Sequence, residues 1–541
     1  MQRFQATYLP YADTRAFSPM VLDYLQQDPV LESFFDYAPT LAGIKEAILK
    51  RKQFPVNREL LVETLQQQYK EMPNSEAVSI QIASLADENT FTIVTAHQPN
   101  LFTGHLYFIY KIIHAIKLAE ELNAHDLGCR FVPVYYMGSE DADLEELGQV
   151  EIDGKRYAWE TNQTGAVGRM KIDATLIKLI DAIEGQVSVL PHAAAIMPLL
   201  KQCYTLGKTI EQATFELVHA LFGSHGLVVV LPDQRAYKAA FSEVMQKELN
   251  ESFSYPLVQE TVNRFPDDYK VQVAGREINL FYLGEQLRER IVRSGDAFEV
   301  LNTDLRFTVG ELENLLKNEP ERFSPNVILR PLFQEMLLPD VVFIGGGGEL
   351  AYWLELKSVF EAAHAFFPVL VLRNSYAIVN QSAEMLARKL NIPTEDLFLP
   401  ELNLVNDWVN RHSNLRLTVD EEMNQVKRIY QSLTEQATAV DPTLAKHVQA
   451  LQTQVLKRLQ ELEKKMLRAE KRKQEDSVRQ IQKLKSALFP GGTLQERVDN
   501  IIPWIARYGL TLLNDIHHHA RGLDQQFCVL EELATGHSPA D

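Results

Sequence analysis

A strand, a polar turn, a helix and a second strand follow one another at residues 91–147, and this order constrains the fold most. The apolar run FTIV opens the stretch, helical periodicity fills 106–122, and the apolar run FVPVYYM closes it at 131–137. A crossover of this kind is right-handed in nearly all proteins and makes its two strands parallel. The stretch therefore predicts a βαβ unit whose ligand site lies beyond the carboxyl ends of the strands.

Two later segments extend this pattern. GLVVVLPD at 226–233 is typical of a buried strand that ends in Pro and Asp. Residues 323–374 predict a helix at 327–337, a strand at 341–344, a glycine run, a helix at 349–364 and a strand at 369–373. With about five parallel strands, the predicted fold class is α/β, a Rossmann-like doubly wound sheet with insertions.

The remaining patterns divide the chain into parts. Apolar residues recur at spacings of three and four from Leu444 to Ala469, within a helix expected over 443–488. This near-heptad pattern predicts an antiparallel coiled-coil arm and, through it, a homodimer. We expect a helical lead-in at 1–85, a core at 86–375 with strand-containing insertions near 150–205 and 265–325, the arm at 376–500, and a helical segment at 501–541 that packs on the body.

The charge balance excludes some classes of partner. The 541 residues include 54 Lys and Arg against 72 Asp and Glu, a net charge of −18, which disfavours nucleic acid but not a small anionic substrate. No run of about 18 apolar residues exists, so we expect no membrane span. The N-terminus lacks the apolar core of a signal peptide, and Cys129, Cys203 and Cys528 have no metal spacing. These features favour a cytoplasmic protein with reduced thiols.

The turn after the first strand is unusually polar. It could bind a phosphate or carboxylate, because a helix N-terminus attracts anions and the imidazoles add donors. The alternative is a capped turn with Thr103 as the N-cap. Its spacing is neither a Walker loop nor GxGxxG. The binding candidates are Gln98, Asn100, Thr103, Gly104 and His105 with Lys111 on the helix, and His97 is a catalytic candidate.

An acidic cluster follows the second strand. Glu140, Asp141 and Asp143 could bind an ammonium group, orient a hydroxyl or act as a general base. The alternative is an acidic first turn of a helix. Since parallel strands end at one edge of the sheet, this cluster should face the polar turn.

The glycine run of the second βαβ unit is a third candidate. Four consecutive glycines would let a ligand approach the backbone closely. The alternative is a tight turn alone, but four glycines are costly in unfolded-state entropy, so a ligand site is favoured. Arg330 could hold a carboxylate through two hydrogen bonds or form a structural ion pair, and Arg373 is a second such candidate. The binding candidates here are Gly346, Gly347, Gly348, Glu349, Tyr352, Asn326, Arg330, Gln334 and Arg373.

No metal site or protein nucleophile is predicted. Consecutive helical residues point in different directions, so His517, His518 and His519 should not share a metal. The residues favour acid–base and electrostatic chemistry.

At these motifs the chain resembles the BshC family, the cysteine ligases of bacillithiol biosynthesis. The resemblance rests on SFFDY at 33–37, HQPNLFTGHLYFIYKI at 97–112, VPVYYMGSEDADLEE at 132–146, residues 323–360, and the C-terminal QER and RYG. It implies a core similar to class I aminoacyl-tRNA synthetases and a helical arm for dimerisation. The turn at 97–105 stands where nucleotidyltransferase relatives bind phosphate, although no KMSKS-like loop is evident.

The implied reaction is the last step of bacillithiol synthesis, which joins L-cysteine to the amine of glucosaminyl-malate. ATP is the candidate cofactor for activating the cysteine carboxylate. Arg330, Arg373 or the helix N-terminus would bind the malate carboxylates, and one of the three acidic residues would accept the amine proton. Two alternatives stay open: a nucleotidylyltransferase or sugar-modifying transferase on the same fold, and a coiled-coil scaffold without activity.

Overall fold

The computed structural model describes residues 3–272 and 275–533. The chain divides into two compact units, each described by itself. The larger unit holds 16–377 together with the chain ends up to residue 12 and at 493–530. The second unit holds mainly 378–492, with 13–15 and the chain from 531.

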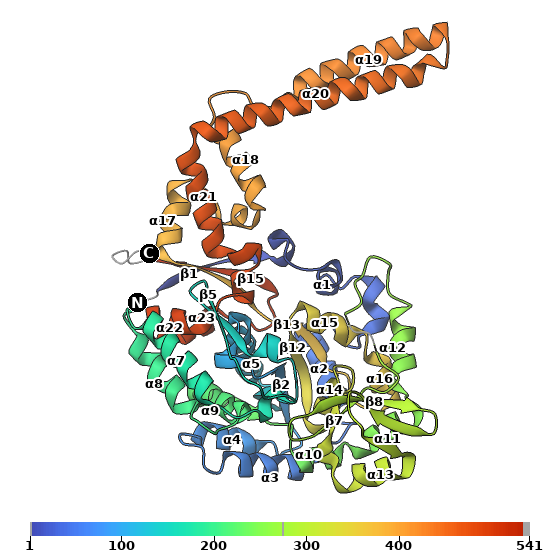
Figure 1. Cartoon of the computed structure of the whole chain (residues 1–541), viewed down its shortest axis with the longest axis vertical. Coiled ribbons are helices and arrows are strands. Elements are labelled where there is room, and N and C mark those ends of the chain that lie inside the picture. The colour runs from blue at the N-terminus through green and yellow to red at the C-terminus, as the bar shows by residue number, and fades with distance from the viewer. Residues whose placement is uncertain (1–2, 273–274, 534–541) are drawn as a thin grey trace. The chain divides into compact units, whose positions relative to one another are not determined.

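A five-stranded parallel sheet forms the centre of the larger unit (Figure 1). Its order is β13-β12-β2-β3-β6, and β2 and β3 pair from Thr90↔Arg130 to His97↔Met137. Both faces are covered, which explains why these strands are continuous apolar runs. The predicted parallel sheet is confirmed. Its strands are β2 (Thr90–His97), β3 (Arg130–Met137), β6 (Val228–Val230), β12 (Asp340–Gly345) and β13 (Val369–Leu372).

The strand order places the site. In chain order the sheet reads fifth, fourth, first, second, third, so the direction of winding reverses between β2 and β12. A crevice opens at the carboxyl ends of the strands beside such a reversal. The turn after β2 and the glycine run after β12 both lie there.

The helices around this sheet agree with the predicted ones, except that one predicted helix is divided into two. The helix predicted at 349–364 is wrong as one element, since it is two helices separated at residues 355–356. The helices are α1 (Pro19–Leu25), α2 (Leu41–Arg51), α3 (Arg58–Tyr69), α4 (Glu76–Ser84), α5 (Leu106–Ala124), α6 (Leu144–Leu147), α10 (Arg235–Ala240), α11 (Ser242–Glu251), α12 (Ser254–Val262), α14 (Leu329–Leu337), α15 (Gly347–Leu354), α16 (Lys357–Ala362), α22 (Ile501–Tyr508) and α23 (Thr511–His519).

The first insertion is a hairpin followed by helices. β4 (Gln149–Ile152) and β5 (Lys155–Ala158) pair antiparallel as expected. Strands were expected in this insertion, but residues 168–173 form only an isolated bridge, between Lys171 and Thr209. The helices α7 (Ala174–Val187), α8 (Ala193–Cys203) and α9 (Ile210–Phe222) complete the insertion.

The second insertion contains the expected hairpins. Its antiparallel sheet has the order β10-β9-β8-β7-β11. The elements are β7 (Leu280–Leu283), β8 (Arg288–Ser294), β9 (Ala297–Val300), β10 (Arg306–Thr308), α13 (Val309–Asn318) and β11 (Phe323–Pro325).

A three-stranded sheet was not predicted. β1 (Phe4–Pro10), β15 (Gln526–Glu532) and β14 (Ser375–Val379) pair in that order. β1 lies in the lead-in that was expected to be helical, and most of β14 and all of β15 lie in the chain from 376 onward that was expected to be almost wholly helical. The pairing joins segments hundreds of residues apart, which no local pattern reveals. Residues 534–541 of the expected C-terminal segment lie outside the described residues.

The second unit contains the predicted arm. α19 (Asp420–Val440) and α20 (Leu444–Lys473) pack as a helical hairpin across the turn at 441–443. The single helix predicted at 443–488 is wrong, since Gln474 leaves helical geometry between α20 and α21 (Glu475–Leu488). The other helices are α17 (Gln381–Lys389) and α18 (Glu401–His412). No helix among the described residues is long and apolar enough to cross a membrane.

Candidate active site

A polar cavity of about 970 Å³ opens at the carboxyl ends of β2, β3 and β12. Its wall carries six basic and four acidic side chains, a basic excess on an acidic protein. Such a wall favours an anionic ligand. The predicted site residues that line it are His97, Gln98, His105, Lys111, Glu140, Asp141, Asn326, Arg330, Gly346, Gly347, Gly348, Glu349, Tyr352 and Arg373.

The polar turn and the acidic cluster face each other as expected. The N–H of Gly138 donates to the carbonyl of His97 at 2.8 Å, which joins the ends of the two strands. Beyond that contact, Nε2 of Gln98 donates to Oδ2 of Asp141 at 3.1 Å. Asp141 is thus oriented by the turn while its carboxylate lines the cavity.

Asn100, Thr103 and Gly104 are candidates of the turn that do not line the cavity. They determine the conformation of the turn instead. Phe102, Thr103 and Gly104 all have positive φ, at 54°, 72° and 63°. A Cβ on Gly104 would lie 2.7 Å from Cβ of Asn100, so this position requires glycine. Asn100 and Thr103 are buried, and Nδ2 of Asn500 holds the turn by donating to the carbonyl of Phe102 at 2.9 Å. Left-handed geometry at a β-branched threonine is uncommon and needs this support.

The start of α5 differs from the expectation. The N-cap is His105 and not Thr103. The first helical N–H, that of Leu106, donates to the carbonyl of Asp499 at 2.8 Å, and Nδ1 of His105 contacts the carbonyl of Val498 at 3.1 Å. The C-terminal segment therefore occupies part of the helix N-terminus that the sequence assigned to an anion.

His97 is a neutral imidazole on the cavity wall. Burial is the main cause that lowers its pKa well below the usual value, and the charge of Lys111 lowers it further. Its Nε2 is buried and has no hydrogen-bond partner among the described residues. A bound molecule could satisfy that atom.

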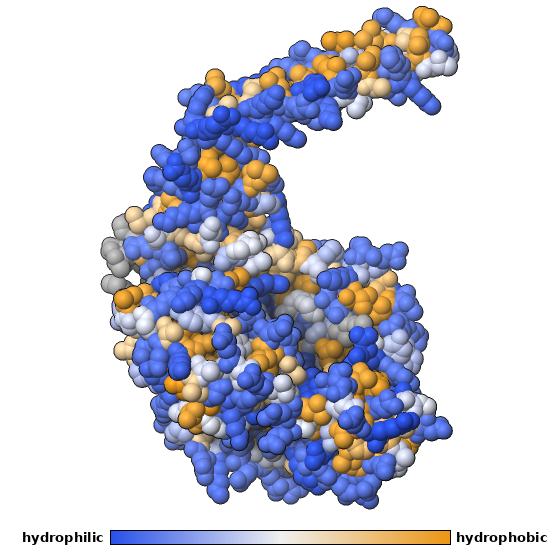
Figure 2. All heavy atoms as spheres, in the orientation of Figure 1, coloured by the Kyte–Doolittle hydropathy of each residue, from blue (hydrophilic) through white to orange (hydrophobic). Residues whose placement is uncertain are grey.

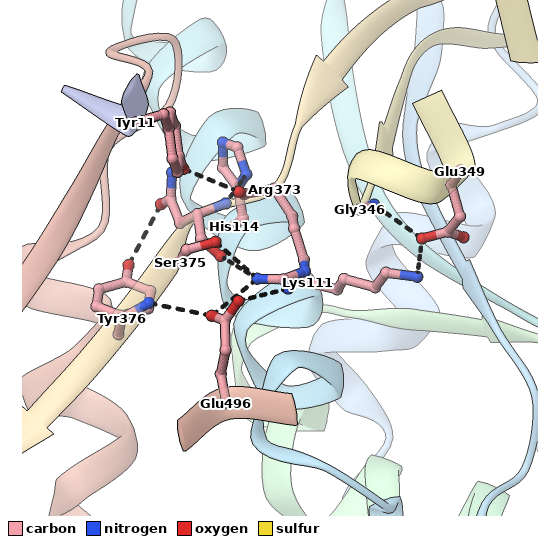
Figure 3. Close-up of polar contacts among 10 residues, drawn as sticks. Tyr11, Lys111, His114, Gly346, Glu349, Arg373, Ser375, Tyr376 and Glu496 are labelled. Carbon is pink, nitrogen blue, oxygen red and sulfur yellow. Dashed lines mark hydrogen bonds and ion pairs between the residues drawn. The ribbon is translucent and has the colours of Figure 1, made fainter. Parts of the chain in front are cut away.

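Lys111 and Glu349 form an ion pair across the cavity floor (Figure 3). Nζ of Lys111 also donates to the carbonyl of Ala96 at 2.9 Å, and burial lowers the pKa of this lysine. The Glu349 carboxylate accepts the N–H of Gly346 at 2.8 Å. The charge of Lys111 is consequently paired, and Glu349 links this lysine to the glycine run.

The two candidate arginines differ in what they bind. Arg373 forms two hydrogen bonds to the Glu496 carboxylate, at 2.7 and 3.0 Å, and is a structural clamp (Figure 3). Arg330 donates to the phenol oxygen of Tyr352 at 2.6 Å. Within 3–272 and 275–533, no carboxylate lies at ion-pair distance from Arg330. Of these two arginines, Arg330 is therefore the one with capacity for an anionic ligand.

Glu140 belongs to a charge network that the sequence did not indicate. Lys238 forms an ion pair with Glu140, contacts Asp233 at 3.3 Å and donates to the carbonyl of Phe323 at 2.7 Å. Arg169 pairs with the other side of Asp233 at 2.6 Å. Burial raises the pKa of Glu140, and Lys238 opposes that rise. Glu140 is held by this network, whereas Asp141 accepts hydrogen bonds from Gln98 and from the N–H of Asp143 and has no ion pair among the described residues.

Three other candidates have local structural contacts. Asp143 is exposed and caps α6 by accepting the N–H of Glu146 at 3.0 Å. Asn326 lines the cavity, and its side chain accepts the N–H of Ile328 at 2.9 Å near the start of α14. Gln334 is buried, donates to Glu335 at 2.9 Å and is not among the lining residues.

The glycine run leaves one stretch of cavity wall bare. None of its glycines has positive φ, so a turn alone does not require them. A Cβ on Gly345 would lie 2.9 Å from Phe343, whereas one on Gly348 would meet nothing within 4 Å. Gly345 is needed for packing, and Gly348 keeps open space beside α15.

Comparison with known families decides the identity of the chain. The family model "Bacillithiol biosynthesis BshC, N-terminal Rossmann-like domain" matches residues 4–374, and "Bacillithiol biosynthesis BshC, C-terminal coiled-coil domain" matches 376–532. The chain belongs to the BshC family.

Relatives in this family match nearly the full chain. One from Cytophaga hutchinsonii, named "Putative cysteine ligase BshC", is 37% identical over 507 residues, which cover 93% of this chain and 95% of the relative. One of the same name from Flavobacterium johnsoniae is 37% identical over 524 residues, covering 96% and 99%. The resemblance seen in the sequence and the predicted fold class are confirmed.

Several lining residues of this BshC-family chain were missed. Asp233, which holds Lys238 but is not itself a lining residue, follows the third strand of the sheet, a position that could have marked its network. Arg497 lies in the QER motif beside Glu496. Tyr107, Tyr136 and Glu146 lie on α5, β3 and α6, elements that the sequence indicated without marking these side chains. Gln272, Arg276 and Arg288 come from the second insertion, which has no motif of its own.

Proposed function

We propose that this chain joins L-cysteine to the amine of glucosaminyl-malate and so forms bacillithiol. Arg330 carries the proposal: a guanidinium on the cavity wall, paired with a phenol and with no carboxylate at ion-pair distance among the described residues. A planar guanidinium suits the carboxylates of malate, which it can bind through two hydrogen bonds.

The remaining charges of the cavity support a dicarboxylate substrate. Arg276 and Arg288 also line the wall, and Arg288 stacks on the ring of Phe281 at 3.9 Å. Arg373 is held by Glu496, so it supplies shape rather than a binding group. The malate end of the substrate would accordingly lie toward Arg330 and not toward Arg373.

Asp141 is the candidate base. The glucosamine amine must lose a proton before its lone pair can attack a carbonyl carbon, and a carboxylate within hydrogen-bond reach can accept that proton. Asp141 lines the cavity and is fixed by Gln98. Glu140 is tied to Lys238, and Asp143 caps a helix.

The cavity also fits a phosphate group. Arg330 offers charge, Nε2 of His97 lacks a partner, and Gly346, Gly347 and Gly348 leave the wall bare at the start of α15. ATP, when bound, would supply the leaving group that activates the cysteine carboxylate toward amide formation. The glycine side suits this group better than α5, whose first N–H is already bound by Asp499.

Calorimetry of glucosaminyl-malate binding tests the proposal. Arg330→Gln should weaken binding about 10- to 100-fold, the effect of losing a charge-assisted hydrogen bond. Arg306→Gln, on the exposed strand β10, is the matched control and should bind like the wild type. Equal binding by the wild type and Arg330→Gln would contradict the assignment of Arg330.

A further inference from the structure

Three potential metal ligands meet away from the cavity. They are Glu120 on α5, His225 at the end of the 3-10 turn Gly223–His225, and His517 on α23. One ligand atom from each lies within 4.8 Å of the other two. The three residues come from distant parts of the chain, so no spacing in the sequence predicts the cluster.

The contacts within this cluster converge on one point. Nε2 of His517 lies 2.9 Å from Oε2 of Glu120, and the rings of His225 and His517 have centroids 5.4 Å apart. Nε2 of His517 is shielded from solvent, yet its approach to Glu120 lacks the geometry of a hydrogen bond. Nε2 of His517 therefore faces the Glu120 carboxylate and the His225 ring without a hydrogen bond to either. A cation between the three groups would satisfy this nitrogen.

The donor set specifies the class of cation. Two imidazoles suit zinc and neighbouring divalent transition metals, whereas calcium and magnesium prefer oxygen ligands. Three protein ligands leave further positions for water, and the Glu120 side chain is 48% exposed, so the ion could enter from solvent. His518 and His519 are not members of the cluster, in keeping with their different directions on the helix.

We infer that Glu120, His225 and His517 bind one divalent transition-metal ion, with zinc as the probe. The site lies nine residues along α5 from Lys111, about 13 Å of helix, and is therefore remote from the cavity. A bound ion would fasten α5, whose first turn borders the cavity, to the 3-10 turn and to α23. Its role is to stabilise this arrangement of helices.

Zinc titration of the metal-free full chain, with a competing chromophoric chelator, tests the inference. We expect one equivalent of high-affinity binding and a rise in melting temperature. His517→Gln and His225→Gln should weaken binding by more than tenfold, because each removes one of three ligands. His518→Gln, one residue along α23, is the matched control and should keep full affinity.

Cobalt provides a second readout, since its visible absorption reports the ligand geometry. The spectrum of bound cobalt should be lost in His517→Gln and unchanged in His518→Gln. Glu120→Gln, at an exposed position, serves if a histidine variant fails to fold. Absence of high-affinity binding, or equal affinity in the wild type and these ligand variants, would overturn the inference.

Discussion

Asp141 and Asp143, two residues apart after β3, have different environments, and this difference predicts different roles. Asp141 faces the cavity and Asp143 caps a short helix. Asp141→Asn should lower kcat for thiol formation about 100-fold or more, the usual contribution of a general base, with little change in KM. Asp143→Asn keeps an equally good cap and should retain full activity. An active Asp141→Asn enzyme would contradict the assigned base.

The Arg373–Glu496 pair predicts a change in stability. The two side chains are 4% and 0% exposed, so Glu496→Gln leaves a buried guanidinium without its counter-charge. The free energy of unfolding, measured by urea titration of the full chain, should fall by about 3–5 kcal/mol. Glu321→Gln breaks the exposed pair with Arg235 and should cost at most about 1 kcal/mol. Equal decreases in the free energy of unfolding of the two variants would contradict the claim that burial makes the Arg373–Glu496 pair important for stability.

At the scale of elements, α5 is held by a neutral histidine, which makes its packing sensitive to pH. Nε2 of His114 donates to the carbonyl of Gly522 at 2.7 Å, and Nδ1 accepts the N–H of Asn374 at 3.1 Å. Burial lowers the pKa of His114 to about 4. Protonation of Nδ1 would break the bond from Asn374, so the folded state resists it.

The sign of the pH effect follows from that lowered pKa. The unfolded chain binds this proton near pH 6.5, so stability from His114 is complete above that pH and is lost as the pH falls toward 4. Between pH 7 and pH 4, the wild type should lose roughly 3 kcal/mol more stability than His114→Gln. The exposed His125→Gln should follow the wild type. Parallel pH profiles for the wild type and His114→Gln would contradict this account.

The elements that the sequence predicted correctly are those with a strong local period. The buried strands β2 and β3 and the largely apolar α5 need only their own residues to be recognised. β1 and β15 depend on each other across the whole chain, and their pairing has no local signature. The same holds for the site. Arg330 could be selected as a candidate from the sequence, whereas the role of Glu496 depends on its ion pair with Arg373, which forms only in the folded chain.

At the scale of the whole molecule, the exposed apolar residues of the arm indicate that the chain assembles with a second copy. No residue of α19 is buried, and Ile429, Leu433, Leu451 and Leu462 are between 41% and 58% exposed. Apolar residues lie along this hairpin in Figure 2. The hairpin leaves these apolar residues exposed, and a second copy could cover them, as in a coiled coil. We therefore expect a homodimer.

Sedimentation of the full chain measures that assembly. Leu433→Glu with Leu451→Glu should shift the protein from dimer to monomer, because charges would replace the apolar seam. Gln449→Glu, on the opposite face of α20, should leave the dimer intact. A wild-type monomer, or a dimer that survives the double change, would contradict the role of the arm.

The most direct measurement of the central claim is mass spectrometry of the purified protein incubated with L-cysteine and glucosaminyl-malate, with and without ATP. We expect the mass of bacillithiol only when ATP is present, together with ADP or AMP, and we expect the Arg330→Gln variant to form no such product. Absence of the product in every mixture, with no measurable binding of glucosaminyl-malate, would contradict it.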